Sequence, residues 1–522
     1  MSFWSTTHLQ AVTAGRWLVP PAAEAGALQG LSIDSRAISP GQVFLALKGE
    51  HFDGHDFLAQ AAQKAGLLIV ADETKAPLRP VQEVDPRRLP HPPAAASGGA
   101  GQPLVGMPPV PSPQTSLART RLPILLVPDT LAALQRLGAA YRDHLHDRGC
   151  KVIAITGSNG KTTTRHLIHT VLSSRFRGTQ SPKSFNNHIG VPLTLLAAGE
   201  MDNFVVVETG TNHPGELAAL GAIVRPDAVV LTSIGEEHME FFGDLAGVAR
   251  EEAAMLPWRR PEALVVIAEQ AWPYVQPLYQ PQPGERLIRY GAAPGDEQAT
   301  LQAWGLGSAA NGGWSFQVQG TKFEVPLPGR HNALNALATL AVGRWMGMED
   351  AAIATALRTA RPAEHRGEVL HLGPAGAGLT LIDDAYNANP ASMRQALGVL
   401  AGFPPPAAGG RRVAVLGDML ELGSQAPDLH RQVGDTIASR YRQPPDQVDH
   451  VITIGRLAMF IAEALARGGW PGEAMSSFAQ WSDDLPSRVA GLLKPGDVVL
   501  IKASRGMKLE RLIVEMEKMH DR

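Results

Sequence analysis

The chain alternates short apolar runs with longer amphipathic stretches, which is the pattern of a protein whose strands and helices follow one another. The runs FVVVE, DAVVLT and ALVVIA occupy residues 204–208, 227–232 and 263–268. Because these runs are continuously apolar, they predict strands that are buried on both faces of a parallel sheet. KVIAIT at 151–156 predicts a further strand, followed by a glycine loop and a helix that begins at Lys161.

The pattern differs on both sides of this predicted sheet. The first ~80 residues contain β-like runs at 43–47 and 67–72, with an alanine-rich helical stretch between them. LPILLV at 122–127 predicts a strand, and the residues that follow Asp129 have the 3.6-residue period of a helix. Short runs separated by glycines between 286 and 325 predict a small antiparallel sheet.

A second series of strands and helices begins near Arg361. A helix is predicted at 333–347, and the later strands are LTLIDDAY, RRVAVLGD, DHVITIG and DVVLIKAS, with a helix ending the chain. We therefore predict an α/β fold of three domains. The predicted domains are a small α/β domain at 1–128, a central parallel-sheet domain with a phosphate loop at 129–361, and a C-terminal dinucleotide-fold-like domain at 362–522.

Residues 85–123 interrupt the alternation. They are dense in Pro, Gly, Ala and Ser and have no periodicity. Because proline removes backbone donors, a packed element is disfavoured here, and we predict a flexible insertion or linker.

Composition narrows the class of protein. The net charge of −3 over 522 residues gives no basic surface for nucleic acid. The single cysteine, Cys150, excludes an internal disulfide framework and a multi-cysteine metal site. The sequence has no signal-peptide pattern and no apolar run approaching 18 residues. We expect a cytoplasmic protein without a membrane span, and a monomer by default.

The motif with the clearest chemistry is TGSNGKTTT at 156–164, which follows a predicted strand and opens a helix. Its glycines let backbone amides surround phosphate oxygens, and the helix adds the positive end of its dipole. Lys161 supplies a charge for the β- and γ-phosphates, and the Thr162 hydroxyl suits Mg²⁺. The plainer alternative is a glycine turn with an exposed lysine. Nucleotide binding alone does not separate kinase, switch, motor and ligase.

Two further residues follow predicted strands and could bind a metal ion in the same crevice. Glu208 closes FVVVE, and His238 lies in SIGEEHMEFFG after the next strand. Carboxylate oxygen suits Mg²⁺, whereas imidazole is a less usual ligand. The alternatives are a helix-capping or surface carboxylate for Glu208 and an ordinary loop histidine for His238.

Several motifs together resemble the Mur ligases. TGSNGKTTT, VVVETGTNHPGE, GEEHMEFFG, PGRHNALNA and DDAYNANPASM occur in the order of that family. The segments at 33–57, 185–196 and 417–423 resemble the members that take D-alanyl-D-alanine. The resemblance covers nearly the whole chain apart from the insertion. It implies an N-terminal UDP-substrate domain, a central ATP-binding domain, and a C-terminal ligase domain that closes over ATP.

The resemblance also implies roles for individual residues. Catalytic roles fall on Lys161, Glu208 and His238, and metal binding on Thr162, Glu208 and His238. ATP contacts are implied for Gly157, Ser158, Asn159, Gly160, Lys161, Thr162, Thr163, Asn332, Arg366 and Asp384. Substrate contacts are implied for Ser35, Arg36, Lys48, Asn186, Asn187, Tyr386, Asn387 and Asn389.

Glu252 departs from the family pattern. Many relatives carry a carbamylated lysine that helps hold a second Mg²⁺, and Glu252 in GVAREEAAML occupies that position. Our hypothesis is that Glu252 offers a carboxylate to the metal directly, although its shorter reach could require a water bridge or leave one metal weakly held. The neighbouring Arg250 and Glu251 could instead form a solvated helix face.

The activity that the resemblance implies is ATP-dependent formation of an amide bond. The cofactors would be ATP and two Mg²⁺ ions, and the substrates UDP-N-acetylmuramoyl tripeptide and D-alanyl-D-alanine, joined through an acyl phosphate in peptidoglycan precursor synthesis. The alternatives are a sibling ligase that adds a different amino acid, a nucleotide-dependent switch or motor, and a catalytically silent scaffold. His213 and His430 are conceivable bases for the amine, but neither is assigned.

Overall fold

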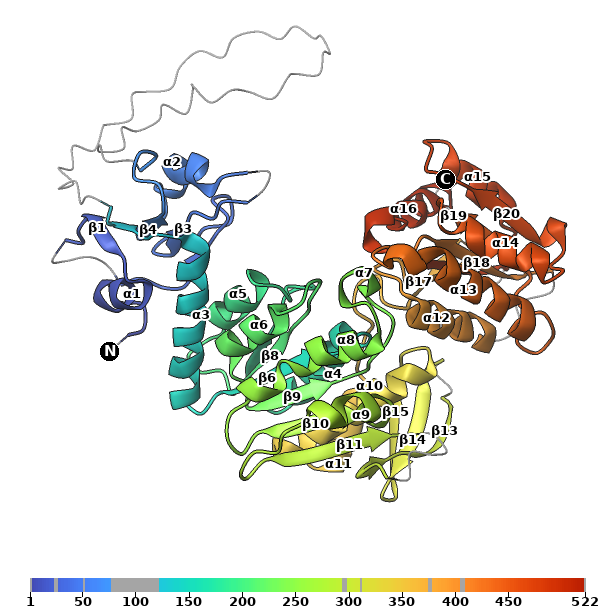
Figure 1. Ribbon diagram of the computed structural model, residues 1–522, viewed down its shortest axis with the longest axis horizontal. Helices are drawn as coiled ribbons and strands as arrows, with labels where there is room; N and C mark the ends of the chain where they lie inside the picture. The colour runs from blue at the N-terminus through green and yellow to red at the C-terminus, as the bar shows by residue number, and fades with distance from the viewer. Residues whose placement is uncertain are drawn as a thin grey trace, which may run out of the picture. The chain divides into compact units, whose positions relative to one another are not determined.

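The computed structural model describes residues 2–22, 27–49, 52–76, 122–292, 298–309, 312–373, 378–403 and 409–520. The chain divides into two compact units, Met1–Ala140 and Tyr141–Arg522 (Figure 1). The division falls within helix α3 (Thr130–Asp147). Most of the predicted insertion at 85–123 lies outside the described residues.

The first unit contains a five-stranded sheet of order β1-β5-β4-β3-β2. The strands are β1 (Arg16–Val19), β2 (Leu31–Ser32), β3 (Val43–Leu45), β4 (Leu67–Val70) and β5 (Ile124–Leu126). Only β1 runs antiparallel to its neighbour in this sheet. The helices are α1 (Thr6–Thr13), the 3₁₀ turn η1 (Gly54–Phe57) and α2 (Leu58–Ala61). Leu58 packs with Phe44 and Leu68 in one buried cluster, which confirms the predicted strands and the helical stretch between them.

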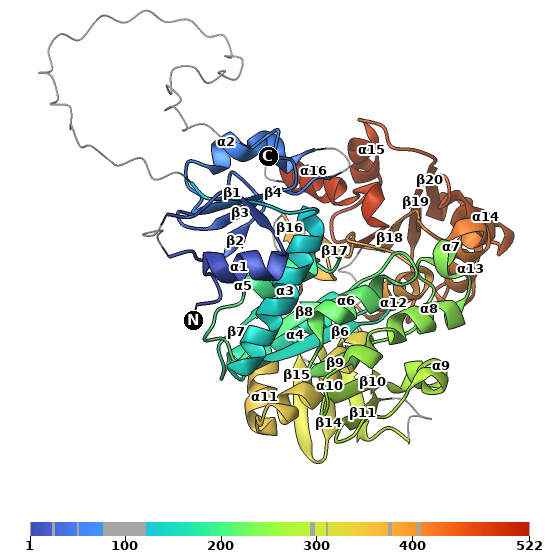
Figure 2. The same ribbon diagram turned by 60° about the vertical axis from the view of Figure 1, so that its left-hand side comes forward.

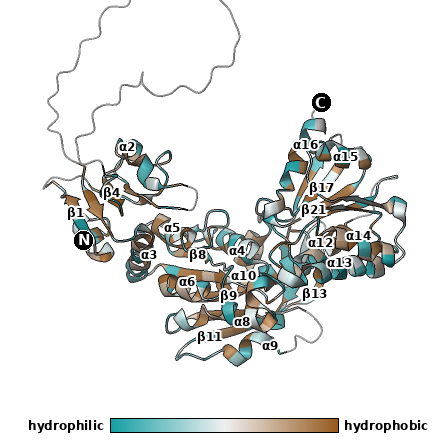
Figure 3. Ribbon diagram, turned by 45° about the horizontal axis from the view of Figure 1, so that its top comes forward, coloured by the Kyte–Doolittle hydropathy of each residue, from teal (hydrophilic) through white to brown (hydrophobic). Residues whose placement is uncertain are grey.

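The second unit begins with a seven-stranded parallel sheet of order β12-β11-β10-β9-β6-β8-β7. Its strands are β6 (Lys151–Thr156), β7 (Gly178–Gln180), β8 (Phe204–Glu208), β9 (Ala228–Leu231), β10 (Leu264–Ala268), β11 (Arg286–Gly291) and β12 (Leu301–Gln302). Figure 3 shows apolar residues along the central strands, which are fully buried. The four apolar runs predicted as strands are thereby confirmed.

Helices flank this sheet, and α10 packs beside α4. They are α4 (Lys161–Ser173), α5 (Gly190–Ala197), α6 (Glu216–Val224), α7 (Met239–Phe242), α8 (Leu245–Ala253), α9 (Trp272–Val275), α10 (Arg330–Trp345) and α11 (Asp350–Leu357). Three 3₁₀ turns accompany them, η3 (Leu256–Trp258), η4 (Glu269–Ala271) and η5 (Gln276–Leu278). We call the sheet and these helices, with the three-stranded sheet described next, the seven-stranded lobe.

The antiparallel sheet predicted between 286 and 325 is only partly correct. β13 (Trp304–Ser308), β14 (Trp314–Val318) and β15 (Thr321–Val325) do form an antiparallel sheet, and α11 lies against β15 (Figure 2). However, β11 and β12 pair parallel and extend the main sheet beyond β10. The connection from β10 through α9 is a helical crossover, which returns the chain in the parallel direction.

The rest of the second unit is built on a six-stranded sheet of order β16-β17-β21-β18-β19-β20, which we call the six-stranded lobe. The strands are β16 (Glu368–Leu372), β17 (Leu379–Asp383), β18 (Arg412–Gly417), β19 (His450–Ile454), β20 (Met475–Phe478) and β21 (Val498–Lys502). β16 is antiparallel to β17 and the remaining pairs are parallel.

Helices cover both faces of this sheet, as expected for a predominantly parallel sheet. They are α12 (Pro390–Gly402), α13 (Ala426–Arg440), α14 (Met459–Arg467), α15 (Leu485–Leu492) and α16 (Glu510–His520), with 3₁₀ turns η6 (Gly423–Gln425), η7 (Gly472–Ala474) and η8 (Arg505–Met507). One buried cluster joins α12, α13 and α14 to the sheet, and a second joins α15 and α16. The edge strands β16 and β20 were not predicted from the sequence. Within the described residues, no helix is both long and apolar enough to cross a membrane.

Candidate functional site

The phosphate loop connects β6 to α4 and requires glycine at two positions. Gly157 has φ of +117° and Gly160 has φ of +88°, a backbone region that side chains disfavour. A Cβ on Gly157 would lie 2.4 Å from Thr232 Oγ1, and one on Gly160 would lie 2.8 Å from Asn335 Oδ1. The loop is therefore locked in a shape that brings backbone amides to the start of a helix, where anions bind.

Lys161 begins α4 and its amine turns back over the loop. Its Nζ donates to Gly157 O at 2.5 Å and lies 3.6 Å from Glu237 Oε1. Burial lowers the pKa of Lys161, but the neighbouring carboxylates, Glu237 foremost, outweigh it and leave the pKa raised. Burial raises the pKa of Glu237 well above its ordinary value, and Lys161 offsets this only in part. The lysine therefore presents a charge at the loop.

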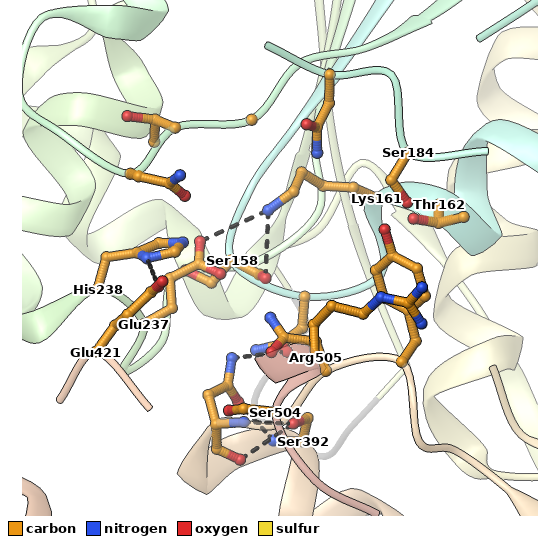
Figure 4. A pocket seen from close by; sticks show the side chains of 18 of the residues that line it. Ser158, Lys161, Thr162, Ser184, Glu237, His238, Ser392, Glu421, Ser504 and Arg505 are labelled. Carbon is orange, nitrogen blue, oxygen red and sulfur yellow. Dashed lines mark hydrogen bonds and ion pairs between the residues drawn. The ribbon is translucent and has the colours of Figure 1, made fainter. Parts of the chain in front are cut away.

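A cavity of about 340 Å³ opens beside the loop and collects most of the predicted site residues (Figure 4). Both lobes of the second unit contribute to its walls. The predicted residues that line it are Ser158, Asn159, Gly160, Lys161, Thr162, Thr163, Asn186, Asn187, Glu208, His238, Arg366, Tyr386, Asn387 and Asn389. Residues that lie up to 230 positions apart in sequence thus meet, as in the bond from Asn389 Nδ2 to Asn159 Oδ1 at 3.0 Å.

A smaller adjacent cavity, of about 70 Å³, contains two further residues predicted to contact ATP, whereas the predicted contact Gly157 lines neither cavity. Asn332 and Asp384 line it together with Thr163 and Arg366. The Asp384 carboxylate pairs with Lys502 Nζ at 2.6 Å. Lys502 is fully buried, and burial lowers its pKa although Asp384 opposes the shift. The paired lysine fixes the Asp384 carboxylate at the wall of the cavity.

The candidate metal ligands line one cavity but do not form a closed cluster. Glu208 is 1% exposed and accepts from Arg165 Nε at 3.2 Å and Asn186 Nδ2 at 3.1 Å. His238 precedes α7 with φ of +48°, and its Nδ1 lies 2.6 Å from Glu421 Oε2. In the described part of the chain, no group of three or more His, Cys, Asp or Glu side chains could hold a metal ion by itself. The set fits Mg²⁺, which is usually bound by one or two carboxylates together with substrate phosphates.

Glu252 lies behind the phosphate loop rather than on the cavity wall. Its Oε2 accepts from Gly157 N at 2.7 Å and from the Thr156 hydroxyl. Its Oε1 is buried and has no hydrogen-bond partner among the described residues. The Glu252 carboxylate lies near that of Glu237 and helps to raise the pKa of Glu237, and a buried carboxylate oxygen of this kind is a candidate acceptor for a further ligand.

The alternative interpretation of Arg250 and Glu251 as a solvated helix face is wrong for Glu251. Arg250 is exposed, but Glu251 is 7% exposed. Its carboxylate accepts from Gly215 N and Leu217 N, each at 2.8 Å. It therefore caps the amino end of α6, a role that depends on a distant segment and that the local pattern did not reveal.

The remaining predicted substrate residues are held in defined positions. Asn187 Oδ1 accepts from Gly190 N at 2.9 Å at the start of α5, and Asn186 contacts Glu208 as described above. The Tyr386 ring lies between two guanidinium groups, with Arg366 at 4.2 Å and Arg505 at 5.3 Å from its centroid. Asn389 caps α12 through its bond from Ser392 N at 2.8 Å.

The three candidate residues of the first unit lie on its surface loops. Ser35 Oγ donates to Gln60 Oε1 at 2.9 Å, and Arg36 pairs with Asp34 at 2.8 Å. The hydrogen bonds from Arg36 lower the pKa of Asp34 to about 2. The backbones of Lys48 and Asp53 pair in an isolated antiparallel β-bridge. Within the described residues, no hydrogen bond or ion pair joins Lys48 to Ser35 or Arg36, and their shared role stays a prediction.

Sequence reasoning missed several residues that line these cavities. Glu237, Glu421 and Arg505 line the larger cavity, and Lys502 lines the smaller one. Glu237 and Glu421 stand inside motifs already singled out, GEEHMEFFG and GDMLELG, so their neighbours could have drawn attention to them. Lys502 lies within a predicted strand and Arg505 follows it, and neither residue carried a comparable signal.

Comparison with family models covers much of the chain. A Mur ligase middle domain matches residues 155–343, and a Mur ligase glutamate ligase domain matches residues 365–505. A third model, described as the catalytic domain of the Mur ligase family, matches residues 27–142.

Individual relatives match over nearly their whole length. A protein from Bacillus subtilis named UDP-N-acetylmuramoyl-tripeptide–D-alanyl-D-alanine ligase is 33% identical over 96% of this chain and 95% of its own. The protein of the same name from Escherichia coli is 30% identical over 93% of each chain. A crystal structure of MurF from Acinetobacter baumannii aligns with a TM-score of 0.75 and 26% identity over 99% of each chain. With its fold, its phosphate loop and its full-length relatives in agreement, this chain belongs to the Mur ligase family.

Proposed function

We propose that this chain joins D-alanyl-D-alanine to the terminal carboxylate of UDP-N-acetylmuramoyl tripeptide at the expense of ATP. The products are UDP-muramoyl pentapeptide, ADP and phosphate, a step in the synthesis of peptidoglycan precursors. The full-length relatives carry the name of this reaction. The single observation that carries the proposal is the cavity in which the phosphate loop, Glu208 and the DDAYNANP segment meet.

The first chemical step is phosphoryl transfer. The tripeptide carboxylate attacks the γ-phosphorus of ATP, the bond to the β–γ bridging oxygen breaks, and an acyl phosphate and ADP form. Two anions at about 4 Å repel by about 4 kcal/mol at an effective dielectric of 20, so charge neutralisation is the main task of the site. Lys161 and the backbone amides of 157–163 supply it, with Arg366 reaching the phosphates from the six-stranded lobe.

The nucleoside of ATP occupies the smaller cavity in this proposal. Asn332 contacts the adenine, and Asp384 contacts the ribose or holds the two lobes together. The Lys502 amine belongs to the same lobe as Asp384 and supports the first role, because it keeps the Asp384 carboxylate in one place.

Thr162, Glu208 and His238 would hold Mg²⁺ in this proposal, and Glu252 would contribute a carboxylate to a second ion. The bound ion adds positive charge at the phosphates. Glu252→Gln is expected to raise the Mg²⁺ concentration that gives half-maximal turnover, because one charged oxygen is lost. An unchanged Mg²⁺ dependence would remove Glu252 from the ligand set.

The second step is attack of the dipeptide amine on the acyl carbon, which releases phosphate from a tetrahedral intermediate. Asn186 and Asn187 face the muramoyl end, and Tyr386, Asn387 and Asn389 face the incoming dipeptide. Ser35, Arg36 and Lys48 of the first unit bind the uridine diphosphate. Closure of the domains over the substrates would exclude water, which would otherwise hydrolyse the acyl phosphate.

The wider assignments follow from this activity. We propose three functional regions, 1–128, 129–361 and 362–522, in a chain that works as a monomer. Because the reaction uses ATP and a nucleotide-linked substrate, we propose that it takes place in the cytoplasm. The proposed reaction involves no nucleic acid, and no membrane span of the chain takes part in it.

The test is phosphate release with ATP, Mg²⁺ and UDP-muramoyl tripeptide, with and without D-alanyl-D-alanine, with product mass measured alongside. We expect release that depends on the dipeptide and a pentapeptide product. Release that needs a different amino acid would identify a sibling ligase, and release without any amine would identify a plain ATPase. Running the assay with meso-diaminopimelate and L-lysine tripeptides determines the preference at the third residue.

A further inference from the structure

We infer that Glu421, on the six-stranded lobe, is a positioning residue that orients the imidazole of His238 on the seven-stranded lobe. The inference rests on the proposed function, in which His238 is a metal ligand. His238 Nδ1 lies 2.6 Å from Glu421 Oε2, and both residues line the larger cavity (Figure 4). With Nδ1 turned to the carboxylate, Nε2 is the nitrogen that remains available to a ligand.

The backbone of both residues is in an uncommon conformation. His238 has φ of +48° and Glu421 has φ of +62°. Residues other than glycine persist in the left-handed region only where their surroundings hold them there, and such residues concentrate at functional sites. Here two of them, from different lobes, direct their side chains at one another.

The segments that carry the pair are packed together around it. Met239 and Phe242 of α7 share a buried cluster with Met419 and Leu422 of the six-stranded lobe. Glu240 N donates to Glu421 O at 3.3 Å. The pair therefore forms only when these segments are docked, and separation of the lobes takes the partner of His238 away.

The contact matches a general feature of metal-binding histidines. Such a histidine usually directs its second ring nitrogen at a carboxylate or carbonyl, which fixes the ring and its tautomer. The His238–Glu421 contact is a close approach of ring nitrogen and carboxylate whose angles fall outside those of an aligned hydrogen bond. Glu421 is half exposed whereas His238 is 13% exposed, so the carboxylate is the movable member of the pair.

The decisive test measures binding of Mn²⁺ to the full chain in the presence of ADP. The amount of free Mn²⁺ is determined from its electron paramagnetic resonance signal. We expect Glu421→Ala to weaken Mn²⁺ binding by about 10- to 100-fold, the usual effect of removing the partner of a metal ligand. Glu421→Gln, which keeps an oxygen acceptor, should recover part of the loss. In a His238→Ala background, Glu421→Ala should have less than about a twofold further effect, because the two residues act as one unit.

Gln425→Ala is the matched control. Gln425 lies in the same segment, is exposed, and joins the lobes through a bond from its Nε2 to Gly243 O at 3.1 Å, but it does not line the cavity. We expect this variant to bind Mn²⁺ within about twofold of the wild type. An equal loss in Gln425→Ala would mean that lobe docking in general, and not Glu421, sets the affinity.

Two other outcomes would overturn the inference. One is wild-type Mn²⁺ affinity in Glu421→Ala, and the other is an undiminished effect of Glu421→Ala when His238 is absent. The readout is independent of which amine the enzyme uses, because no dipeptide is present. A chain that made no pentapeptide but showed the expected Mn²⁺ pattern would refute the proposed reaction and leave the role of Glu421 standing.

Discussion

At the residue scale, the chemistry depends on a buried positive charge that neighbouring carboxylates stabilise. Lys161 lies among buried carboxylates, and its amine is held by carbonyls of its own loop. The fold does not need this amine to close the loop, because Gly157, Gly160 and the start of α4 already define it. The lysine is therefore expected to serve turnover more than stability.

Lys161→Ala is predicted to lower turnover by about three orders of magnitude or more, since about 4 kcal/mol of charge repulsion is no longer offset. The thermal unfolding midpoint should stay close to that of the wild type. Phosphate release and calorimetry measure the two effects. Lys322→Ala, which removes a 60%-exposed lysine of the same lobe, is the control and should change neither. Near-normal turnover in Lys161→Ala would refute the phosphate-loop assignment.

A second residue-scale prediction concerns His331 at the start of α10. Burial lowers the pKa of His331 to about 4 from its ordinary value near 6.5. The folded state thus favours the neutral ring. The contribution of His331 to the free energy of unfolding is fully present above about pH 6.5 and is lost as the pH falls toward about pH 4. When the pH is lowered from about 7 to about 5, the free energy of unfolding of His331→Gln should fall by about 1 to 2 kcal/mol less than that of the wild type. The range includes a reduction for the partial exposure of the His331 side chain to water.

Urea denaturation without nucleotide at the two pH values measures this difference. His371→Gln, a change at an exposed histidine on β16, serves as the control and should follow the wild type. An identical pH dependence in His331→Gln and wild type would show that His331 does not govern acid stability.

Single residues were predictable from sequence where a local motif fixes them. Lys161 and Thr162 stand in a loop whose glycines dictate its shape, and Glu208 ends a buried strand, so their meeting in one cavity could be expected. Glu421 and Lys502 could not be assigned in the same way. Their roles come from contacts with His238 and Asp384, which lie more than a hundred residues away and are decided by tertiary packing.

At the element scale, α8 acts as a support for the loops at the end of the parallel strands. It presents Glu252 to the phosphate loop and, one residue earlier, Glu251 to the amino end of α6. Consecutive residues of a helix point about 100° apart. Glu251 and Glu252 can therefore contact two different segments only because α8 lies between them. The sequence of the helix does not reveal these contacts, because the run of charges at 250–252 is equally typical of a solvated surface.

Glu251→Ala is predicted to destabilise the chain by about 1 to 3 kcal/mol, the cost of leaving buried backbone donors without a partner. The neighbouring Arg250→Ala should change stability by less than about 0.5 kcal/mol, because Arg250 is exposed. Chemical denaturation of the two variants compares them directly. Equal stability of the two variants would show that Glu251 does not cap α6.

Elements were predictable in proportion to how strongly burial marks them. The fully buried strands β8, β9 and β10 appear in the sequence as nearly continuous apolar runs. The direction of β11 was not predictable, because a half-exposed strand has the same pattern of apolar and polar residues in parallel and antiparallel sheets. The edge strands β16 and β20 are also half-exposed, and their pairing partners decide that they are strands at all.

At the scale of the whole molecule, the site is completed by bonds between the two lobes of the second unit. Asn389 both caps α12 and donates through Nδ2 to Asn159 Oδ1 in the phosphate loop. Arg394 of the same helix pairs with Glu236 at 3.1 Å. The helix thereby ties the six-stranded lobe to the loop that binds phosphate in our proposal.

Asn389→Asp separates these two roles of Asn389. Aspartate is as good a helix cap as asparagine, so the unfolding midpoint should be nearly unchanged. The donor that faces Asn159 Oδ1 becomes an acceptor, and we expect kcat/KM for ATP to fall about tenfold or more. Asn389→Ala, which loses cap and donor together, should lower both stability and kcat/KM. A kcat/KM in Asn389→Asp equal to that of the wild type would show that the interlobe bond is dispensable.

The seating of α7 among the side chains of the six-stranded lobe also bears on how this enzyme could be inhibited. Met239, Phe242, Met419 and Leu422 pack together immediately beside the His238–Glu421 pair. An apolar compound that wedged between them would pull the two side chains apart without resembling ATP, the sugar nucleotide or the dipeptide. Because the same docking completes the ATP site, the compound and ATP would oppose each other's binding through the position of the lobes and not through a shared site.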